Sequence, residues 1–423
     1  MADNDEVNPL FRRYRREAVL LHRPWPPHAG PRTHSHLGGL PRLPETHAWP
    51  RTSAGTRLHF LAQIDCADIP FKTALPERGV LFFFGRDDTD AWMAASPATD
   101  HCRVLYAPDS VALTPPRQPP ADLAPLGFAR KWLNVHPAWP VVPLRFDSFP
   151  GGDALPHPND RDARGWRGIL DRLARGVRGV PEEPEIGPDV REAYDAELYA
   201  RRAAALVAAT GAQPPGTAMT WREAGAAIFH FAASGPQSFP QHWACIHHLA
   251  RAILDRPLFY SLGEAREGER VAAAEGWLDR SREGPLDRPV AEDDRQALRT
   301  WLATLGDKHD LVCRGAAGTI RSWAGDPALA ALVPGHVYAA CAPFFYGYRE
   351  AYPQFSQMLG HSPGPHVARP VGDPTICLLN LDTDLALGWY FGEGGQCTFW
   401  ITPGDLARRD FSRVEGRLDG DGH

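Results

Sequence analysis

The chain has 423 residues, and its 45 Lys and Arg against 51 Asp and Glu give a formal net charge of −6. That balance excludes a generally basic protein that coats nucleic acid, and we expect neither a nucleic acid nor a membrane as a partner. The 39 glycines and 42 prolines exceed the usual share but stay below that of a disordered low-complexity chain. Together with 13 tryptophans, this predicts a folded protein of many short elements.

The first predicted strands lie in the proline- and glycine-rich part from 32 to about 150. Apolar runs bounded by turn-forming residues predict strands at 58–65, 79–84, 104–106 and 141–146. From about 185 to 333 the segments become longer and richer in Ala, Arg, Glu and Leu. They predict helices at 189–209, 220–231, 241–254, 267–282, 291–305 and 326–333. Strand-like runs return at 376–381 and 397–401, so the pattern indicates a β-rich protein interrupted by a helical block.

The two β-rich ends resemble each other. The triplets Gln63-Ile64-Asp65 and Asn380-Leu381-Asp382 each end an apolar strand, and Phe82 and Phe399 follow them at the same distance. One interpretation is coincidence between common apolar strands. The other is a core built from two duplicated units, whose amide-apolar-acid strand ends would flank a shared groove.

Several of these fragments are similar to a known family. Residues 38–44, 49–50 and 58–65 read GGLPRLP, WP and LHFLAQID, and they resemble the opening of the YwqG-like family, a bacterial domain of unknown function. In the family's order, MLGH, LLNLDTD, FGEGG and TFWI follow at 358–361, 378–384, 391–395 and 398–401. The resemblance covers roughly 32–150 and 340–415. It implies a β-rich mixed fold without an established catalytic set, and relatives near secreted-toxin genes suggest a protective, partner-binding role.

Three positions depart from the family's pattern. This chain has Ser356, Asn380 and Glu393 where the family commonly has His, Gln and Asp. Productive catalytic placement needs about 0.5 Å, so three changes in side-chain length weigh against a catalytic site.

We therefore expect an α+β fold with a two-lobed β-rich core of duplicated units and a large helical insertion. The expected parts are an N-terminal extension at 1–31, core at 32–154, helical insertion at 155–335, core at 336–415 and a flexible tail at 416–423. Seven cysteines without C-x-x-C spacing, and no apolar run long enough for a signal segment or a membrane span, predict a cytoplasmic protein with free thiols.

The densest acidic cluster is Asp382, Asp384 and Glu393. Alternate residues of a strand point the same way, so Asp382 and Asp384 could converge on a hard cation such as Ca²⁺ or Mg²⁺. The favoured alternative is that these carboxylates, and Asp65 likewise, accept hydrogen bonds from turn N–H groups. We expect no cofactor, no metal and no catalytic residue. The candidate binding groove comprises Trp49, Gln63, Asp65, Asn380, Asp382, Asp384 and Glu393.

These patterns favour a non-enzymatic binding protein that recognises a protein or peptide, in an immunity-like or assembly role. The alternative is a metal-assisted hydrolase that uses the acidic cluster. Large aromatic residues of the helical block and the segment after it suggest an interface with a protein partner or a second copy, although burial within the block would explain them as well. The candidate interface residues are Trp221, Trp243, Tyr346 and Tyr348.

Overall fold

The structure is a computed structural model of the whole chain. It describes residues 4–24, 33–87, 101–126, 134–136, 138–151, 155, 186, 188–210, 240, 242–254, 264–286, 288–304, 333, 335–345, 356–362, 369, 371, 373–382, 387, 389, 391 and 393–421.

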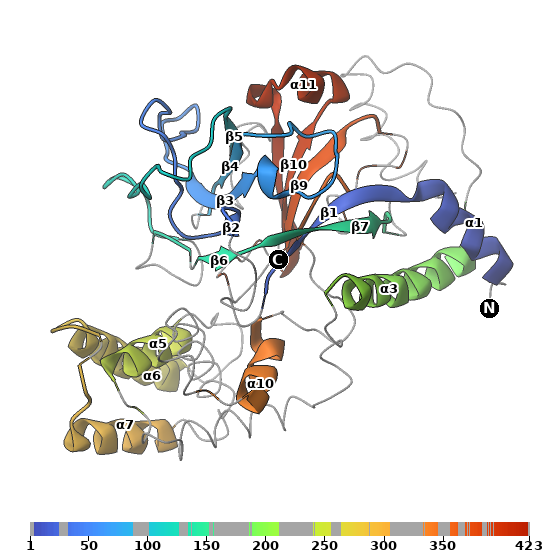
Figure 1. Ribbon diagram of the computed structural model, residues 1–423. Coiled ribbons are helices and arrows are strands. Elements are labelled where there is room, and N and C mark those ends of the chain that lie inside the picture. The colour runs from blue at the N-terminus through green and yellow to red at the C-terminus, as the bar shows by residue number, and fades with distance from the viewer. Residues whose placement is uncertain are drawn as a thin grey trace.

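Two antiparallel β-sheets organise the described part of the chain (Figure 1). In spatial order, the first sheet contains β11 (Glu415–Asp421), β10 (Glu393–Ile401), β9 (Ile376–Asp382), β8 (Gln357–Met358), β1 (Arg16–His22) and β7 (Val142–Ser148). The second contains β5 (Cys102–Ala107), β4 (Val80–Gly85), β3 (His59–Asp65), β2 (His36–Leu37) and β6 (Trp139–Pro140). Sheets and helices together confirm the expected α+β class, and the strands predicted between 58 and 146 correspond to β3, β4, β5 and β7.

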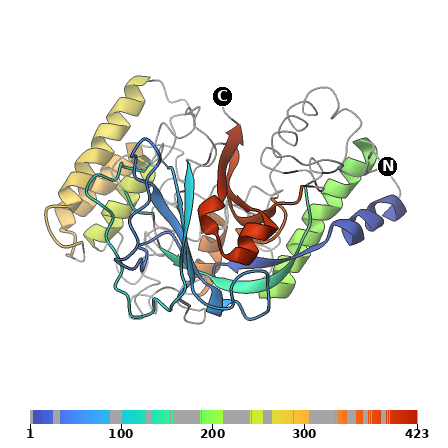
Figure 2. The ribbon, with the colours of Figure 1, turned by 90° about the horizontal axis from the view of Figure 1, so that it is seen from above.

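The main core lies between the two sheets. It joins residues from both ends of the chain, such as Leu61 and Phe83 with Leu379 and Phe399, all fully buried. In Figure 2 the blue strands of one sheet and the red strands of the other stand next to each other. Burial stabilises by roughly 1.5–3 kcal/mol for an apolar side chain of this size, so loss of the contact between the sheets would lower the free energy of unfolding substantially.

Both sheets contain a run of five strands paired in the same order. One run is β6-β2-β3-β4-β5 and the other is β1-β8-β9-β10-β11. The second strand of each run, β2 or β8, places a polar residue opposite a residue with an amide side chain on the next strand. His36 faces Gln63, and Gln357 faces Asn380. The two ends of the chain therefore build units of similar topology that share one core.

Two segments differ from the sequence-based expectation. Residues 16–22, assigned to an N-terminal extension, form β1, an interior strand paired with both β7 and β8. The apolar run from Ala18 to Leu21 is buried there, because both faces of the strand are covered. Residues 416–421, expected to lie in a flexible tail, belong to β11, which pairs with β10.

The helices fall into three groups. The helices α1 (Asn4–Tyr14) and α3 (Pro188–Thr210) lie beside β7, and the rings of Phe11 and Tyr194 stack with centroids 4.4 Å apart. Short helical elements flank the strands: η2 (Cys66–Asp68), α11 (Pro403–Arg408) and η7 (Phe411–Arg413). A third group of longer helices follows α3 along the chain.

These later helices pack in two ways. A separate small core, which includes Ile246, Ala274 and Leu298, joins α5 (Trp243–Leu254), α6 (Glu264–Ser281) and α7 (Glu292–Thr304). By contrast, α10 (Gly335–Phe345) packs against the main core through Val337 and Cys341.

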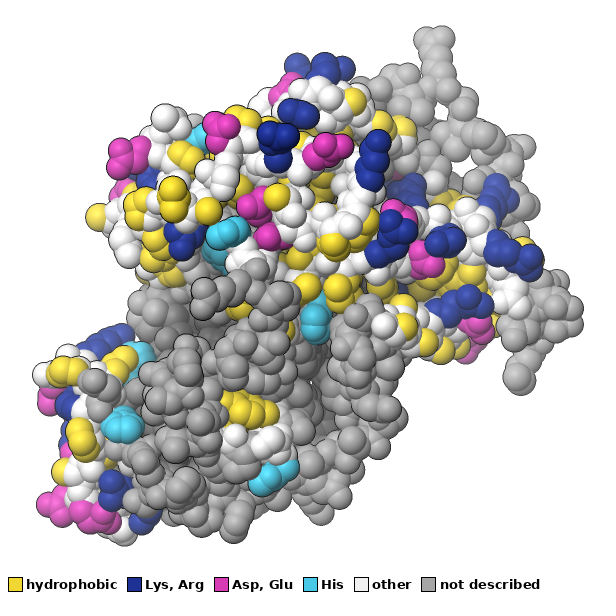
Figure 3. Space-filling model, viewed as in Figure 1, with side chains coloured by type: hydrophobic (Ala, Val, Ile, Leu, Met, Phe, Trp, Pro, Cys, Tyr) yellow, Lys and Arg dark blue, Asp and Glu magenta, His cyan; other side chains and the backbone are white. Residues whose placement is uncertain are grey.

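The predicted helices at 189–209, 241–254, 267–282 and 291–305 are confirmed. Those at 220–231 and 326–333 lie outside the described residues. No helix among the described residues combines the length and apolarity that crossing a bilayer requires. On the face in Figure 3, basic and acidic side chains are intermixed across the described surface.

Candidate functional site

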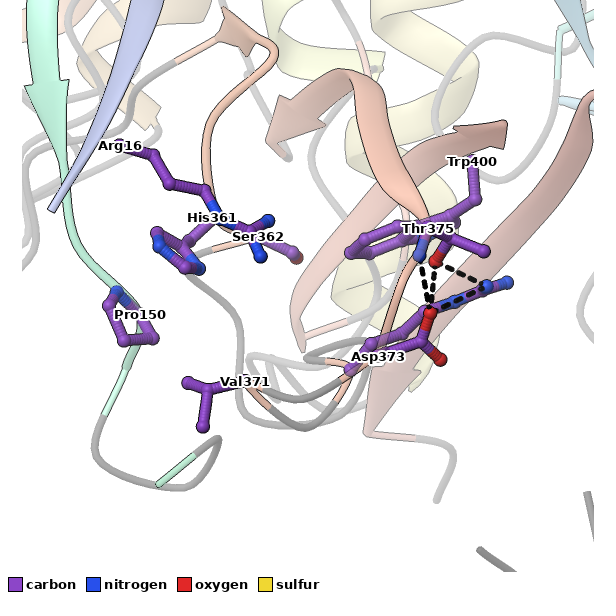
Figure 4. A pocket seen from close by; sticks show the side chains of 9 residues that line it. Arg16, Pro150, His361, Ser362, Val371, Asp373, Thr375 and Trp400 are labelled. Carbon is purple, nitrogen blue, oxygen red and sulfur yellow. Dashed lines mark hydrogen bonds and ion pairs between the residues drawn. The ribbon is translucent and has the colours of Figure 1, made fainter. Parts of the chain in front are cut away.

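A small pocket lies where β1, β10 and the segment between β8 and β9 meet (Figure 4). The space between its walls is about 290 Å³ when open solvent is counted, and its closed part holds little more than a water molecule. Its lining residues are Arg16, Pro150, His361, Ser362, Arg369, Val371, Asp373, Thr375 and Trp400.

Arg16 is the first residue of β1 and reaches into this pocket (Figure 4). Its neighbour Arg15 is exposed and forms an ion pair with Asp147 at 2.9 Å. The half-buried Arg16 side chain, in contrast, makes no hydrogen bond or ion pair with any described residue. Burial lowers the pKa of Arg16, and the nearby Asp373 offsets only part of that effect. Arg16 therefore holds a partly desolvated positive charge without a close counter-ion among the described residues.

Arg369, the second arginine of the pocket, is held in place on several sides. Its Nη2 lies 2.8 Å from Glu415 Oε2, its Nη1 donates to Thr375 Oγ1 at 2.7 Å, and the guanidinium lies 4.6 Å from the centre of the Trp400 ring. Asp373 lies 3.8 Å away on the same side. Burial lowers the pKa of Arg369, while Asp373 opposes this shift. Two carboxylates thus balance the charge of Arg369.

His361 forms another wall of the pocket and is uncharged at neutral pH. Its Nε2–H donates to the carbonyl of Tyr14 at 2.7 Å, and its backbone N–H donates to Ser148 Oγ at 3.0 Å. Burial, followed by the charge of Arg16, lowers the pKa of His361 to about 3. The histidine therefore contributes shape and no positive charge.

Ser362 connects the pocket to two residues of the predicted groove. Its hydroxyl donates to Gln396 Oε1 at 3.1 Å and lies 3.5 Å from Asn380 Oδ1. Asn380 Nδ2 in turn donates to Asp382 Oδ1 at 2.9 Å. Asn380 and Asp382 are buried behind the pocket, where they fix its wall and do not line open surface.

The arrangement suits a small anion. Arg369 has carboxylates in contact and His361 is neutral, so among the described side chains of the pocket Arg16 is the cation without a carboxylate in contact, although Asp373 lies nearby. Pro150, Val371 and Trp400 supply apolar walls around it. A guanidinium in such surroundings binds carboxylate or phosphate oxygens by charge-assisted hydrogen bonds, which are stronger where water is partly excluded.

Three other predicted groove residues lie in the second sheet or in the segment before it. Gln63 is fully buried, and its amide accepts from the N–H of Arg42 and donates to the carbonyl of His34, both at 2.8 Å. Trp49 is buried as well, and its indole N–H donates to the carbonyl of Leu58. Both side chains hold loops against the sheet and are not available to an outside partner.

Asp65 follows the turn-capping alternative. It precedes η2, and its carboxylate accepts from the N–H of Ala67 at 3.0 Å. Burial raises the pKa of Asp65, which is the cost of enclosing this cap.

The remaining predicted site residues divide into two sets. Trp243 is buried in the small helical core, where its ring packs near Trp277 and under the guanidinium of Arg288. Glu393 begins β10, but its side chain lies outside the described residues. Also outside them are Asp384, Trp221, Tyr346 and Tyr348. Among the residues the structure describes, no three His, Cys, Asp or Glu side chains are grouped as a metal site would require.

The sequence analysis missed Arg16 and Arg369 as site residues. Arg16 belongs to the short basic stretch Arg12-Arg13-Tyr14-Arg15-Arg16, and a stretch of this kind most often indicates a solvated helix face. The apolar run that follows Arg16 was the available signal, since it marks a strand that would turn Arg15 and Arg16 to opposite sides. No comparable sequence pattern marks Arg369.

Both ends of the chain are similar to one family of proteins. Residues 35–162 and 346–419 match the model of a family described as a domain of unknown function (DUF1963). No curated protein matches the chain. The second matched segment contains His361, Ser362, Arg369 and Trp400, so most of the pocket lies inside it, whereas Arg16 lies before the first.

Proposed function

We propose that the protein is a non-enzymatic binding protein that recognises a protein or peptide by seating one of its carboxylates against Arg16. The observation that carries this proposal is the half-buried guanidinium of Arg16, which has no counter-ion in contact among the described residues while the pocket's other arginine has two. Leaving a charge partly desolvated costs free energy that a bound anion would recover.

The charge balance favours a monoanion. Arg16 is the pocket cation with no carboxylate in contact, so it can pair with one added carboxylate, whereas a phosphate dianion would bring a second negative charge close to Asp373 and Glu415. The apolar walls at Pro150 and Val371 suit the carbon atoms next to that carboxylate. A peptide C-terminus and an Asp or Glu side chain share this chemistry.

The geometry argues against hydrolysis by the neighbouring Ser362 and His361. The Ser362 hydroxyl donates to Gln396, and the imidazole N–H of His361 donates to the Tyr14 carbonyl, so neither prepares a nucleophile. With its pKa near 3, His361 is also a poor general base at neutral pH. The metal-assisted hydrolase gains no support from the described residues, because Asp382 already accepts from Asn380.

We also infer that the chain is a YwqG-like bacterial protein with a large helical insertion. The order of its motifs and the similar extent of the matched family segments support this. A cytoplasmic location is part of the same proposal. It is supported by five described cysteines, all buried and none in a disulfide, as expected in a reducing compartment.

Calorimetric titration of the full chain tests the binding proposal. The probes are N-acetyl-phenylalanine, its C-terminal amide and inorganic phosphate. We expect saturable binding of the carboxylate alone, weakened about tenfold or more by Arg16→Gln, which is the size of a lost charge-assisted hydrogen bond. Arg15→Gln, a neighbouring arginine on the other side of the strand, is the matched control and should change nothing. Equal binding of the amide, or equal effects of the two variants, would reject the proposal.

A further inference from the structure

A proline-rich segment crosses the surface of the second sheet far from Arg16 in the sequence. Residues 113–120, called here the proline strap, read LTPPRQPP. Within it, residues 115–120 belong to no helix or strand. Leu113 at its start is 98% exposed.

The sequence of residues 114–120 favours a polyproline II conformation. Each of the four prolines fixes its own φ near −65°, and each residue before a proline is disfavoured in the α region. This second restriction applies to Thr114, Pro115, Gln118 and Pro119. Within 114–120, Arg117 escapes both restrictions, and hydrogen bonds hold it.

Hydrogen bonds pin one side of the proline strap to the domain. The N–H of Arg117 donates to the carbonyl of Pro41 at 2.8 Å, and its guanidinium donates to the carbonyl of His47 at 2.7 Å. The carbonyl of Thr114 accepts from Arg42 at 2.6 Å. These bonds hold the backbone along its length, so the segment is ordered before any partner arrives.

The pinned side and the free side follow the threefold period of polyproline II. Thr114, Arg117 and Pro120 recur every third residue and are partly buried. The neighbouring row of Leu113, Pro116 and Pro119 runs along the surface, with the first two exposed and Pro119 half-buried. The proline strap therefore presents Pro116 and Pro119 at Pro-x-x-Pro spacing, and the exposed Leu113 lies in the hydrogen-bonded turn that precedes them.

We propose that the proline strap is a preformed ligand for a partner domain whose aromatic-lined groove binds polyproline II helices. Such grooves take prolines spaced three apart, which is the spacing of Pro116 and Pro119. Because proline stiffness and the arginine hydrogen bonds already order the segment, binding would cost little conformational entropy. This inference does not depend on the Arg16 pocket.

Titration of the full chain with three purified probes, an SH3, a WW and an EVH1 domain, tests the proposal. We expect at least one domain to bind saturably, and the pair Pro116→Ala and Pro119→Ala to weaken that binding by roughly tenfold or more, as for a binding hot spot. The matched control is the pair Pro115→Ala and Gln118→Ala, which removes a proline and shortens side chains on the third, exposed row. It should retain binding within about twofold.

Two further results decide the matter. Since Pro119 is half-buried, Leu113→Ser is measured as well; its fully exposed position leaves the fold intact, and it should also weaken binding. Failure of all three domains to bind, or equal losses in the control pair, would overturn the proposal. Light scattering that detects self-association abolished by Leu113→Ser would overturn it too, because the proline strap would then serve a second copy of the chain.

Discussion

Phe83 in β4 and Phe399 in β10 occupy equivalent positions in the two sheets and pack edge to face, with ring centroids 5.1 Å apart. Phe83 pairs with Ala62 and Phe399 with Leu379, on the middle strand of each five-strand run. A residue that contacts its own counterpart lies beside the approximate twofold relation between two units. This contact joins the N-terminal and C-terminal ends of the chain into one core.

Replacing each of these two rings with leucine should measure the energetic coupling between the sheets. Phe83→Leu and Phe399→Leu should each lower the free energy of unfolding by ~1 kcal/mol. The double variant should depart from additivity by about 0.5–1.5 kcal/mol, because the edge-to-face contact is lost only once. Urea unfolding at fixed pH measures all three values.

Phe82 provides the control for that cycle. It neighbours Phe83 on β4 but belongs to a different buried cluster, on the opposite face of the strand. Phe82→Leu combined with Phe399→Leu should therefore be additive. Additivity in the Phe83 cycle as well would show that the two sheets do not couple through this contact.

The same two strands show how far sequence reasoning reached. It placed both strands correctly and matched Gln63 with Asn380. The strand pairing agrees with that match, because each ladder skips the residue two positions before the amide, Leu61 in one sheet and Leu378 in the other. It also matched Phe82 with Phe399, whereas the ladders make Phe83 the counterpart. Apolar runs such as FFF and TFWI fit at either of two offsets, and only the hydrogen-bond register decides between them. Origin by duplication stays a prediction.

The pocket was harder to predict than the fold for a physical reason. Apolar periodicity reports which face of a strand is buried, and it located most strands and helices. The pocket depends on which of several arginines lacks a counter-ion, and the acids that balance Arg369 include Glu415, 46 residues away. Such a pairing leaves no local pattern in the chain.

Gln63 should be a stability residue with no direct part in binding. Gln63→Ala would leave the N–H of Arg42 and the carbonyl of His34, both in partly buried hydrogen bonds, without these partners, at a cost of roughly 1–3 kcal/mol. When protonated, the Gln63→Glu side chain keeps an acceptor and an O–H donor, so it should cost less than Gln63→Ala. When ionised, it loses the donor and buries a charge, so it should cost more. Urea unfolding at pH 5 and pH 8 checks this order. A neutral effect of Gln63→Ala would contradict the loop-pinning role.

Gly39 lies where its segment closely approaches Ala138. Its φ is +74°, and a Cβ there would lie 2.7 Å from the Cβ of Ala138. Gly39→Ala should therefore cost about 1–2 kcal/mol for the left-handed conformation and a further ~1–3 kcal/mol for the clash. Gly55 has φ +88° with open space around it, so Gly55→Ala should show the conformational part alone. Thermal or urea unfolding compares the two, and equal losses would mean that the contact with Ala138 relaxes freely.

Because of the buried His361, the free energy of unfolding should decrease as the pH falls. Its folded pKa, about 3, lies below the ordinary value of 6.5, so the unfolded chain takes up a proton in this window and the folded chain does not. Its contribution is present above pH 6.5 and lost as the pH falls toward 3, by about 2 kcal/mol between pH 6.5 and 5. His361→Gln should show a shallower slope than the parent chain over that range. Matching slopes would mean that His361 is protonated in the folded protein.

The most direct test of the central claim follows the side-chain Nε–H resonance of Arg16 by nitrogen-15 NMR during an acetate titration of arginine-labelled protein. The signal is assigned by its absence in Arg16→Gln, and Arg15 serves as the internal reference. The account predicts a saturable shift at Arg16, none at Arg15, and no response of either to acetamide. An Arg16 signal that does not move, or one that moves in step with Arg15, would contradict the proposed carboxylate site.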